Sequence, residues 1–405
     1  MTTLVARSRW LATAPTLLGG NTVFFDDHAG LAGYGIADEI TVTLTDPESA
    51  PTLATRLREI EHDNEVGVAG SGPVSFMALP FAAARSGTAH IPQVILGRTR
   101  DSKGWVTTVA PANAASGSLD TLVEQALRAT NATAADPQRF TLAPRVSHEQ
   151  WRAVVERALG EIANGRLDKV VLARALDIEA DRPFPLENVM ARLARLHPSC
   201  LRFAVDGFVG ASPELLLRKR GDTIQSTPLA GTTGRTGDPE ADAEAGTTLL
   251  SSAKERREHV FVTEQLRASL DTIATDIVVG EPELHSFRNV MHLGTRITAR
   301  SAAHPLDLLA ALHPTPAVAG TPTSAALGFI ETYEPHDRGR YAGPVGWLDA
   351  SGNATFAVGI RSAELDGARA QMWAGVGVVA GSDPDAELAE TQLKFQAMLA
   401  ALVRP

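Results

Sequence analysis

Three charged side chains near the C-terminus share one face of a predicted helix. Glu387, Glu390 and Lys394 stand at positions i, i+3 and i+7, which places them in one row along the helix. Two carboxylates and an ammonium group in a row suit a metal or substrate site, although a solvated salt-bridge stripe has the same spacing. The preceding GVGVV strand and AGSDP turn favour the site, because glycines let a ligand approach backbone amides.

A second helix, predicted over residues 251–273, offers further carboxylates. It contains Glu255 and Glu258, and Glu258 shares a helical face with the apolar Phe261 and Val262. A buried carboxylate at this place needs a partner or a metal, whereas a glutamate at the exposed rim needs neither. One carboxylate from each of two helices would suit Mg²⁺, a hard cation that prefers oxygen ligands and keeps several waters.

Two more ionisable residues stand among apolar neighbours. Lys169 opens a strand predicted over residues 169–180 and shares a face with Val171; burial would lower the pKa of this lysine toward that of a general base. A strand-end lysine that reaches water is the alternative. Glu214 follows Pro213 in an apolar segment, where burial would raise the pKa of the carboxyl and make it a general acid. The alternative is an exposed glutamate on a half-buried strand.

Arg361 ends the apolar stretch TFAVGIR. Ala357 and Gly359 lie on the same face of the strand predicted there, and their small size leaves room for a ligand. A guanidinium group can grip a carboxylate with two parallel hydrogen bonds. Arg361 is therefore a candidate carboxylate-binding residue, with an ordinary strand arginine as the alternative.

The elements that must position these residues are hairpin strands and separate helices. Ser147 is a candidate N-cap for an amphipathic helix, and Ser382 and Asp383 are cap candidates for the closing helix. Runs of hairpin strands with segregated helices predict an α+β fold. The predicted strands cover 39–44, 92–98, 104–110, 169–180, several segments of 200–229 and much of 339–380, and the predicted helices lie within 118–130, 147–165, 186–198, 251–273 and 383–402.

Composition excludes several classes of function. The chain has 405 residues, 44% of them hydrophobic, and a net charge of -10, which argues against nucleic acid as a partner. A single cysteine, Cys200, allows neither a disulfide framework nor a thiolate metal site. No apolar run approaches the roughly 20 residues that cross a bilayer, and the N-terminus lacks a signal-peptide core. We therefore expect a cytoplasmic protein, of two or three domains by length.

Taken together and in this order, the motifs resemble those of the chorismate-utilising enzymes, a family that includes isochorismate, salicylate, anthranilate and aminodeoxychorismate synthases. The resemblance is strong over residues 150–402 and loose before them. The motifs are KVVLAR (169–174), GASPELLL (210–217), TPLAGTTGR (227–235), KERREH (254–259), NVMHL (289–293), HPTPAVAG (313–320), DRGRYAGPVGW (337–347), AVGIR (357–361), GVGVV (375–379) and ELAETQLK (387–394).

The family fold implies one chorismate-binding domain over residues 1–405, in place of two or three. Two stacked antiparallel β-sheets flanked by helices are expected, with a variable N-terminal half at 1–145 and a catalytic core at 147–402. The resemblance also implies chorismate as the small-molecule substrate and Mg²⁺ as the cofactor. A monomer is expected, without a glutaminase subunit and without contact to nucleic acid or a membrane.

The resemblance also assigns roles to individual residues. It implies that Lys169 activates water and that Glu214 protonates the leaving hydroxyl group. The implied metal ligands are Glu258 and Glu390, with Glu387 acting through water, and the implied substrate-binding residues are Arg361, Lys394, Gly375, Gly231, Thr232, Ala317 and Tyr341.

Three positions indicate which family reaction to expect. Ammonia-using relatives generally lack a lysine at the position of Lys169, and one common type of aminodeoxychorismate synthase has a nucleophilic lysine where Ala230 stands. Salicylate synthases usually have threonine at the position of Ala317. These differences favour an isochorismate synthase, with a salicylate synthase or a non-catalytic chorismate-binding module as alternatives. Val376 departs from the GAGIV common in the family and is expected to crowd the nearby backbone without abolishing function.

Overall fold

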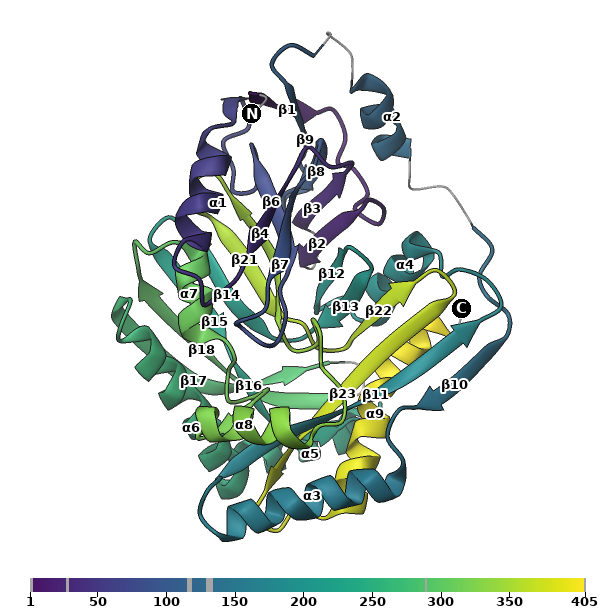
Figure 1. Cartoon of the computed structure of the whole chain (residues 1–405), viewed down its shortest axis with the longest axis vertical. Coiled ribbons are helices and arrows are strands. Elements are labelled where there is room, and N and C mark those ends of the chain that lie inside the picture. Colours follow the sequence, from purple (N-terminus) through teal and green to yellow (C-terminus); the bar gives the residue numbers. More distant parts are fainter. Residues whose placement is uncertain (1–2, 27–28, 115–118, 129–133, 288–289, 404–405) are drawn as a thin grey trace.

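The structure is a computed structural model that places two large β-sheets and a set of flanking helices (Figure 1). It describes the chain apart from residues 1–2, 27–28, 115–118, 129–133, 288–289 and 404–405, and apart from the side chains of Lys254, Arg257 and Glu258.

The larger sheet has 13 strands among the described residues and contains the first and the last strand of the catalytic core. In spatial order they are β10 (Phe140–Pro144), β11 (Lys169–Ala180), β23 (Arg369–Val379), β22 (Ser362–Asp366), β13 (Phe208–Ser212), β12 (Leu201–Val205), β2 (Thr22–Asp26), β3 (Ala29–Tyr34), β8 (Val94–Arg98), β9 (Gly104–Pro111), β1 (Leu4–Leu11) and β5 (Glu61–Asn64), and β19 (Gly320–Thr321) pairs with β11.

The smaller sheet has ten strands within the same described part of the chain. Their order is β16 (Leu229–Gly234), β18 (Val290–Arg300), β15 (Thr223–Thr227), β14 (Leu215–Arg220), β21 (Ala354–Val358), β20 (Pro344–Asp349), β6 (Val74–Ala78), β7 (Gly87–Ile91) and β4 (Asp38–Val42), and β17 (Thr275–Ser286) pairs with β18. Across both sheets the pairs are antiparallel except for β1 with β5 at one edge, which are parallel.

Each sheet contains strands from both halves of the chain. In the larger sheet β2 pairs with β12, and in the smaller sheet β6 pairs with β20. The expected α+β architecture of two antiparallel sheets with flanking helices is confirmed. The two inter-half pairs also support the proposal of a single domain, because backbone hydrogen bonds run through both sheets without a break between the halves.

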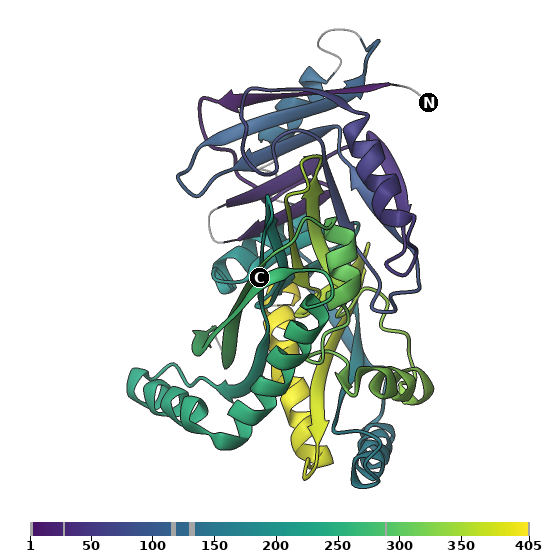
Figure 2. The ribbon, with the colours of Figure 1, turned by 90° about the vertical axis from the view of Figure 1, so that its left-hand side faces the viewer.

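The helices lie around the sheets, most of them in the lower half of Figure 1 and two, over residues 49–58 and 120–128, in its upper half (Figures 1 and 2). The closing helix contacts β23 of the larger sheet and packs beside helices α3 (His148–Ala163) and α4 (Leu186–Leu196). None of the described helices is long and apolar enough to cross a membrane. The helices are α1 (Ser49–Arg58), α2 (Asp120–Arg128), α3 (His148–Ala163), α4 (Leu186–Leu196), α5 (Pro239–Ser251), α6 (Ala253–Leu270), α7 (Pro305–Leu312), α8 (Thr323–Tyr333) and α9 (Pro384–Leu402).

Apolar side chains fill the space between the two sheets. Phe24 and Phe203 from the larger sheet and Phe76 and Phe356 from the smaller one are almost fully buried and belong to one cluster. A second cluster lies on the other face of the larger sheet, under α4 and α9. The larger sheet is therefore buried on both faces, which explains why its central strands read as apolar runs rather than as clean alternation.

Local capping signals in the sequence are confirmed at two helices. Ser147 caps α3, and its hydroxyl accepts a hydrogen bond from the Gln150 backbone N–H at 3.1 Å while the Gln150 side chain accepts one from the Ser147 N–H at 2.9 Å. Asp383 caps α9. Ser382, the other candidate, instead accepts a hydrogen bond from the Val379 N–H and closes the turn before the helix.

The helix predicted over residues 251–273 is confirmed as α6 (Ala253–Leu270), which begins two residues later and ends three residues earlier than predicted. The preceding helix α5, which ends at Ser251, was not predicted. Ser252 separates them and caps α6 by accepting a hydrogen bond from the Glu255 N–H. The apolar face inferred for α6 is only half correct, since Val262 is buried and Phe261 is 61% exposed.

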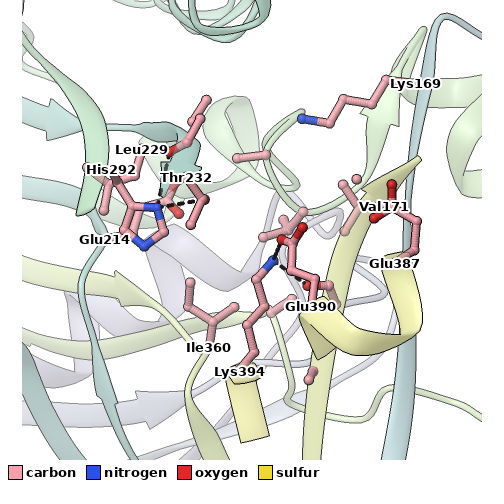
Figure 3. Close-up of a pocket in the computed structure, with 18 of the residues that line it drawn as sticks. Lys169, Val171, Glu214, Leu229, Thr232, His292, Ile360, Glu387, Glu390 and Lys394 are labelled. Carbon is pink, nitrogen blue, oxygen red and sulfur yellow. Dashed lines mark hydrogen bonds and ion pairs between the residues drawn. The ribbon is translucent and has the colours of Figure 1, made fainter. Parts of the chain in front are cut away.

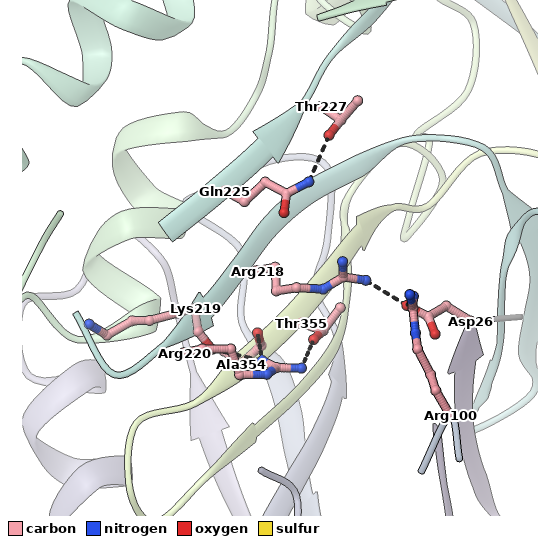
Figure 4. A network of polar contacts seen from close by, with 9 residues as sticks. All are labelled: Asp26, Arg100, Arg218, Lys219, Arg220, Gln225, Thr227, Ala354 and Thr355. Carbon is pink, nitrogen blue, oxygen red and sulfur yellow. Dashed lines mark hydrogen bonds and ion pairs between the residues drawn. The ribbon is translucent and has the colours of Figure 1, made fainter. Parts of the chain in front are cut away.

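A charged contact joins the two sheets near β2 (Figure 4). Asp26, at the end of β2, accepts hydrogen bonds from Arg218 of β14 at 2.6 Å and from Arg100 of the β8–β9 turn at 3.0 Å. Arg218 is largely buried, and burial lowers its pKa. Asp26 therefore provides the negative charge that makes the burial of Arg218 tolerable.

We predict that Asp26→Asn lowers the free energy of unfolding by about 1–3 kcal/mol, because it leaves a partly buried guanidinium without a counter-charge. Urea denaturation of the purified variant measures this. Asp101→Asn is the matched control, since Asp101 pairs with Lys103 on the surface and its loss should not change the denaturation midpoint. Equal effects of the two substitutions would contradict the assignment.

Candidate active site

The predicted site residues line one cavity of about 420 Å³ (Figure 3). β11, β23, β16 and α9 supply most of its wall, and the loop after α7 supplies another part. The side chain of Glu258, a predicted metal ligand, lies outside the described part of the structure. Every other predicted site residue lines the cavity: Lys169, Glu214, Gly231, Thr232, Ala317, Tyr341, Arg361, Gly375, Glu387, Glu390 and Lys394.

Lys169 enters the cavity from the first position of β11. The alternation inferred from the sequence is confirmed, because Lys169 and Val171 line the cavity while Arg174 points to the opposite face. There the Arg174 guanidinium donates a hydrogen bond to the Thr391 hydroxyl of α9 at 2.7 Å. The strand that carries the lysine is therefore tied to the helix that carries Glu387, Glu390 and Lys394.

Gly377 makes room for the Lys169 side chain, a role that was not predicted from the sequence. The register places Gly377 opposite Val171 on the neighbouring strand β23. A Cβ atom at position 377 would lie 2.7 Å from Lys169 Cε and 3.3 Å from Nζ, so the lysine side chain would have to move from its present position. The second glycine of GVGVV thus lets the lysine cross β23. Val376 is buried in the core and does not line the cavity.

Glu214 lies in the short connection between β13 and β14. It is 3% exposed, and burial raises the pKa of its carboxyl to about 8. The backbone N–H of Leu229 and the charge of Lys169 lower this pKa in part. The prediction that Glu214 is buried is therefore confirmed. At neutral pH its side chain is a carboxylic acid that can donate a proton into the cavity.

Arg361 is correctly placed in the cavity, but its predicted strand position is wrong. It lies between β21 and β22 with a φ of 52°, a left-handed conformation that a non-glycine residue adopts at some cost in energy. The Ala211 N–H donates to its carbonyl at 3.1 Å and holds the turn. This turn, rather than strand alternation, aims the guanidinium at the cavity.

The Arg361 guanidinium makes no hydrogen bond or ion pair with any residue whose position the structure describes, and burial lowers its pKa. A buried cation with unused donors is costly unless an anion reaches it. The group is thus suited to a carboxylate ligand.

Lys394 is held by two neighbours in the structure. Its ammonium group forms an ion pair with Glu390 Oε1 at 2.7 Å and donates a hydrogen bond to the Gly375 carbonyl at 2.8 Å. Burial lowers the pKa of Lys394, and the charge of Glu390 partly opposes this. The salt bridge expected from the spacing of these two residues is therefore present, and it faces the cavity rather than bulk solvent.

His292 also lines the cavity, although no functional role was predicted for it from the sequence. Its Nδ1 lies 2.9 Å from the Thr232 hydroxyl and 3.2 Å from the Gly231 carbonyl. Burial, with the nearby positive charges of Arg361 and Lys394, lowers the pKa of His292 to about 3. The ring is thus neutral at physiological pH and acts as a hydrogen-bonding partner that fixes Thr232.

Carboxylates from two helices reach the cavity. Glu387 and Glu390 come from α9, and Glu255, which the sequence reading did not choose as a ligand, comes from α6. No cluster of three or more potential metal ligands occurs among the side chains that the structure describes. The available carboxylate oxygens suit a hard divalent cation such as Mg²⁺ better than zinc, whose sites usually include histidine or cysteine.

Comparisons with known proteins point to one enzyme family. A family model described as chorismate binding enzyme matches residues 5–403. A putative isochorismate synthase, MenF, from Mycobacterium tuberculosis is 37% identical over 350 residues, covering 82% of this chain and 87% of that protein. The isochorismate synthase EntC from Escherichia coli is 36% identical over 335 residues, covering 81% and 80%. The solved structure of MenF, the menaquinone-specific isochorismate synthase from Escherichia coli, is similar with a TM-score of 0.84 at 25% identity, covering 99% of this chain and 95% of that one.

The raised pKa of Glu214 predicts a pH dependence of stability. Between the ordinary pKa of 4.5 and the folded-state value of about 8, the folded protein binds one more proton than the unfolded chain. The free energy of unfolding should therefore fall as pH rises through this range, by at most about 1.4 kcal/mol per pH unit.

Glu214→Gln should remove this contribution, because an amide does not titrate. Urea denaturation at about pH 5.5 and about pH 7.5 measures the difference between the variant and the parent protein. Glu281→Gln, at an exposed position of β17, is the control and should keep the parent behaviour. An unchanged pH dependence in Glu214→Gln would show that this carboxyl titrates normally.

Proposed function

Because the chain belongs to the chorismate binding enzyme family, we propose that it is an isochorismate synthase. It would convert chorismate to isochorismate by adding water at ring carbon C2 and releasing the hydroxyl group at C4. The observation that carries the proposal is that Lys169 and the buried, protonated Glu214 open onto one cavity. A base and an acid on one ring are what the reaction needs, because water is a poor nucleophile and hydroxide a poor leaving group.

Each proton in the proposed reaction has a place. In the proposed step Lys169 Nζ takes a proton from water as the oxygen bonds to C2, and the ring double bonds shift. The C4–oxygen bond breaks as Glu214 donates its proton to the leaving hydroxyl, which departs as water. The pKa of about 8 keeps Glu214 loaded with that proton at neutral pH.

Chorismate carries two carboxylates, and the cavity offers cations for them. Arg361 has unused donors among its described surroundings, so it is the first candidate to grip a substrate carboxylate with two hydrogen bonds. Lys394 and the Gly375 backbone complete the proposed set. Gly231, Thr232, Ala317 and Tyr341 would shape the pocket around the ring.

We propose that Glu390 and Glu258 bind Mg²⁺ directly, with Glu387 acting through a water molecule. When bound, the ion would supply positive charge that holds a substrate carboxylate and offsets negative charge developing in the transition state. The cavity supports this with carboxylate oxygens from Glu255 of α6 and from Glu387 and Glu390 of α9. Glu390 would then be shared between the cation and its present partner Lys394.

Isochorismate as the released product is favoured over salicylate by Ala317. This residue lines the cavity where salicylate synthases usually carry threonine, so a hydroxyl group is missing from the pocket. A non-catalytic binding module is the less favoured alternative, since both the proposed base and the proposed acid line the cavity. The product would enter siderophore, salicylate or menaquinone biosynthesis, and the enzyme would act in the cytoplasm as a monomer without a glutaminase subunit.

Product analysis tests the function directly. Purified protein incubated with chorismate and Mg²⁺ should form isochorismate, detected by liquid chromatography, with no matching release of pyruvate. Salicylate and pyruvate in equal amounts would instead identify a salicylate synthase. Tight binding of chorismate without any product would identify a binding module.

Lys169→Ala should reduce kcat by about 10²–10⁴-fold, the usual contribution of a general base, while chorismate still binds. Steady-state kinetics and calorimetric titration with chorismate measure the two effects. Lys103→Ala is the control, because that lysine is exposed on a β-turn. Near-normal turnover of Lys169→Ala would place the base elsewhere.

Glu390→Gln should weaken Mg²⁺ binding by about tenfold or more, because it removes a charged oxygen ligand. Titration calorimetry with Mg²⁺ alone measures this without turnover. Asp385→Asn is the control on the same helix, since Asp385 is exposed and pairs with Arg152. Equal Mg²⁺ affinity in the Glu390→Gln variant and the parent protein would remove Glu390 from the metal site.

A further inference from the structure

Arg338 connects two segments of the cavity wall. It lies between α8 and β20, is 4% exposed and borders the cavity itself. One terminal nitrogen of its guanidinium donates to the Val171 carbonyl at 2.7 Å, and the other donates to the Val318 carbonyl at 2.8 Å. Val171 belongs to the strand of the proposed base, and Val318 follows Ala317 in the loop after α7. Both valines line the cavity.

The guanidinium is itself held on further sides. Its Nε donates to Glu334 Oε2 at 2.8 Å in an ion pair whose two side chains are 2% and 3% exposed. The other oxygen of Glu334 accepts a hydrogen bond from the Ala173 N–H of β11 at 2.8 Å. The face of the guanidinium lies over the Phe81 ring, with Cζ 4.4 Å from the ring centre. Few other orientations are open to such a group.

We propose that Arg338 is a positioning residue that sets the spacing between the Lys169 strand and the Ala317 loop, and so the fit of the ring between them. The proposal rests on the proposed function. It does not require Arg338 to touch the substrate, because the residue acts through the backbone of Val171 and Val318.

Arg340 offers a matched control two residues away. Its guanidinium also pairs with a carboxylate, Glu364, at 2.8 Å, and also donates to two backbone carbonyls, those of Val205 and Asp206. It also lies over a phenylalanine ring. Arg340 does not line the cavity, however, and its side chain is 24% exposed. The two arginines thus make the same kinds of contact, but only Arg338 donates to backbone carbonyls of residues that line the cavity.

Arginine-to-lysine substitution is the sharpest change. A lysine keeps the charge, but a single ammonium group on a flexible stem cannot reproduce the planar fork that spans Val171, Val318 and Glu334. A shift of about 1 Å between reacting groups can cost about 100-fold in rate. We expect R338K to lower kcat at least about tenfold more than R340K, with the KM for chorismate within about threefold of the parent value.

The experiment compares the parent protein, R338K and R340K in steady-state kinetics, with thermal unfolding to separate catalysis from stability. A parent protein that leaves chorismate unchanged overturns the proposed function. An active parent with a smaller kcat difference between the two variants, or with the loss of R338K confined to KM, overturns the positioning role alone.

A second pair of variants covers the case in which R338K does not fold. E334Q leaves the arginine in place but removes the charge that anchors it, and E364Q does the same at Arg340. We expect kcat to fall at least about threefold in E334Q and not in E364Q, and equal values would contradict the proposal.

A crystal structure of the folded Arg338 or Glu334 variant tests the spacing without turnover. The Val171 and Val318 carbonyls should move apart relative to the structure of the matched Arg340 or Glu364 variant. An unchanged separation would overturn the proposal even for an inactive protein.

Discussion

The removal of the Glu214 carboxyl from water is the constraint on which the site depends. A buried carboxylate is costly, so the group keeps its proton up to a pH of about 8. Two neighbours work against this, namely the Leu229 N–H and Lys169, and burial prevails over both. The cavity therefore holds a protonated carboxyl group together with Lys169, the proposed base.

The architecture makes this burial possible. Because β2 pairs with β12 and β6 pairs with β20, the N-terminal half extends both sheets and closes the apolar layer between them. The larger sheet is covered on its other face by α4 and α9, so the strands next to Lys169 are shielded on both sides. Gly377 on β23 has no side chain, and this leaves the space through which Lys169 reaches the cavity.

The sequence predicted best where a local rule determines the outcome. The Ser147 cap, the Glu390–Lys394 pair and the inward face of β11 all follow from short-range spacing. The resemblance to the family motifs predicted which residues belong to the site, including Glu214. Helix α5 was missed, whereas the start of α6 was predicted to within two residues, the usual uncertainty of a helix end.

Tertiary contacts account for the other differences. The left-handed turn at Arg361 depends on a hydrogen bond from Ala211, 150 positions earlier in the chain. The roles of His292 and Arg338 likewise depend on partners that are distant in sequence, Thr232 and Val171 among them. Spacing rules do not reach such pairs, and an unremarkable histidine or arginine in the sequence gives no sign of the group that it will fix.

The central claim, a carboxylic acid kept protonated inside the cavity, is open to direct measurement. Infrared difference spectroscopy across a pH titration, with the Glu214→Gln variant to assign the band, follows this one carboxyl group. We predict that its protonated band disappears with a pKa of about 8. A titration near the ordinary value of 4.5 would contradict the account, because the proposed acid would then be ionised at neutral pH.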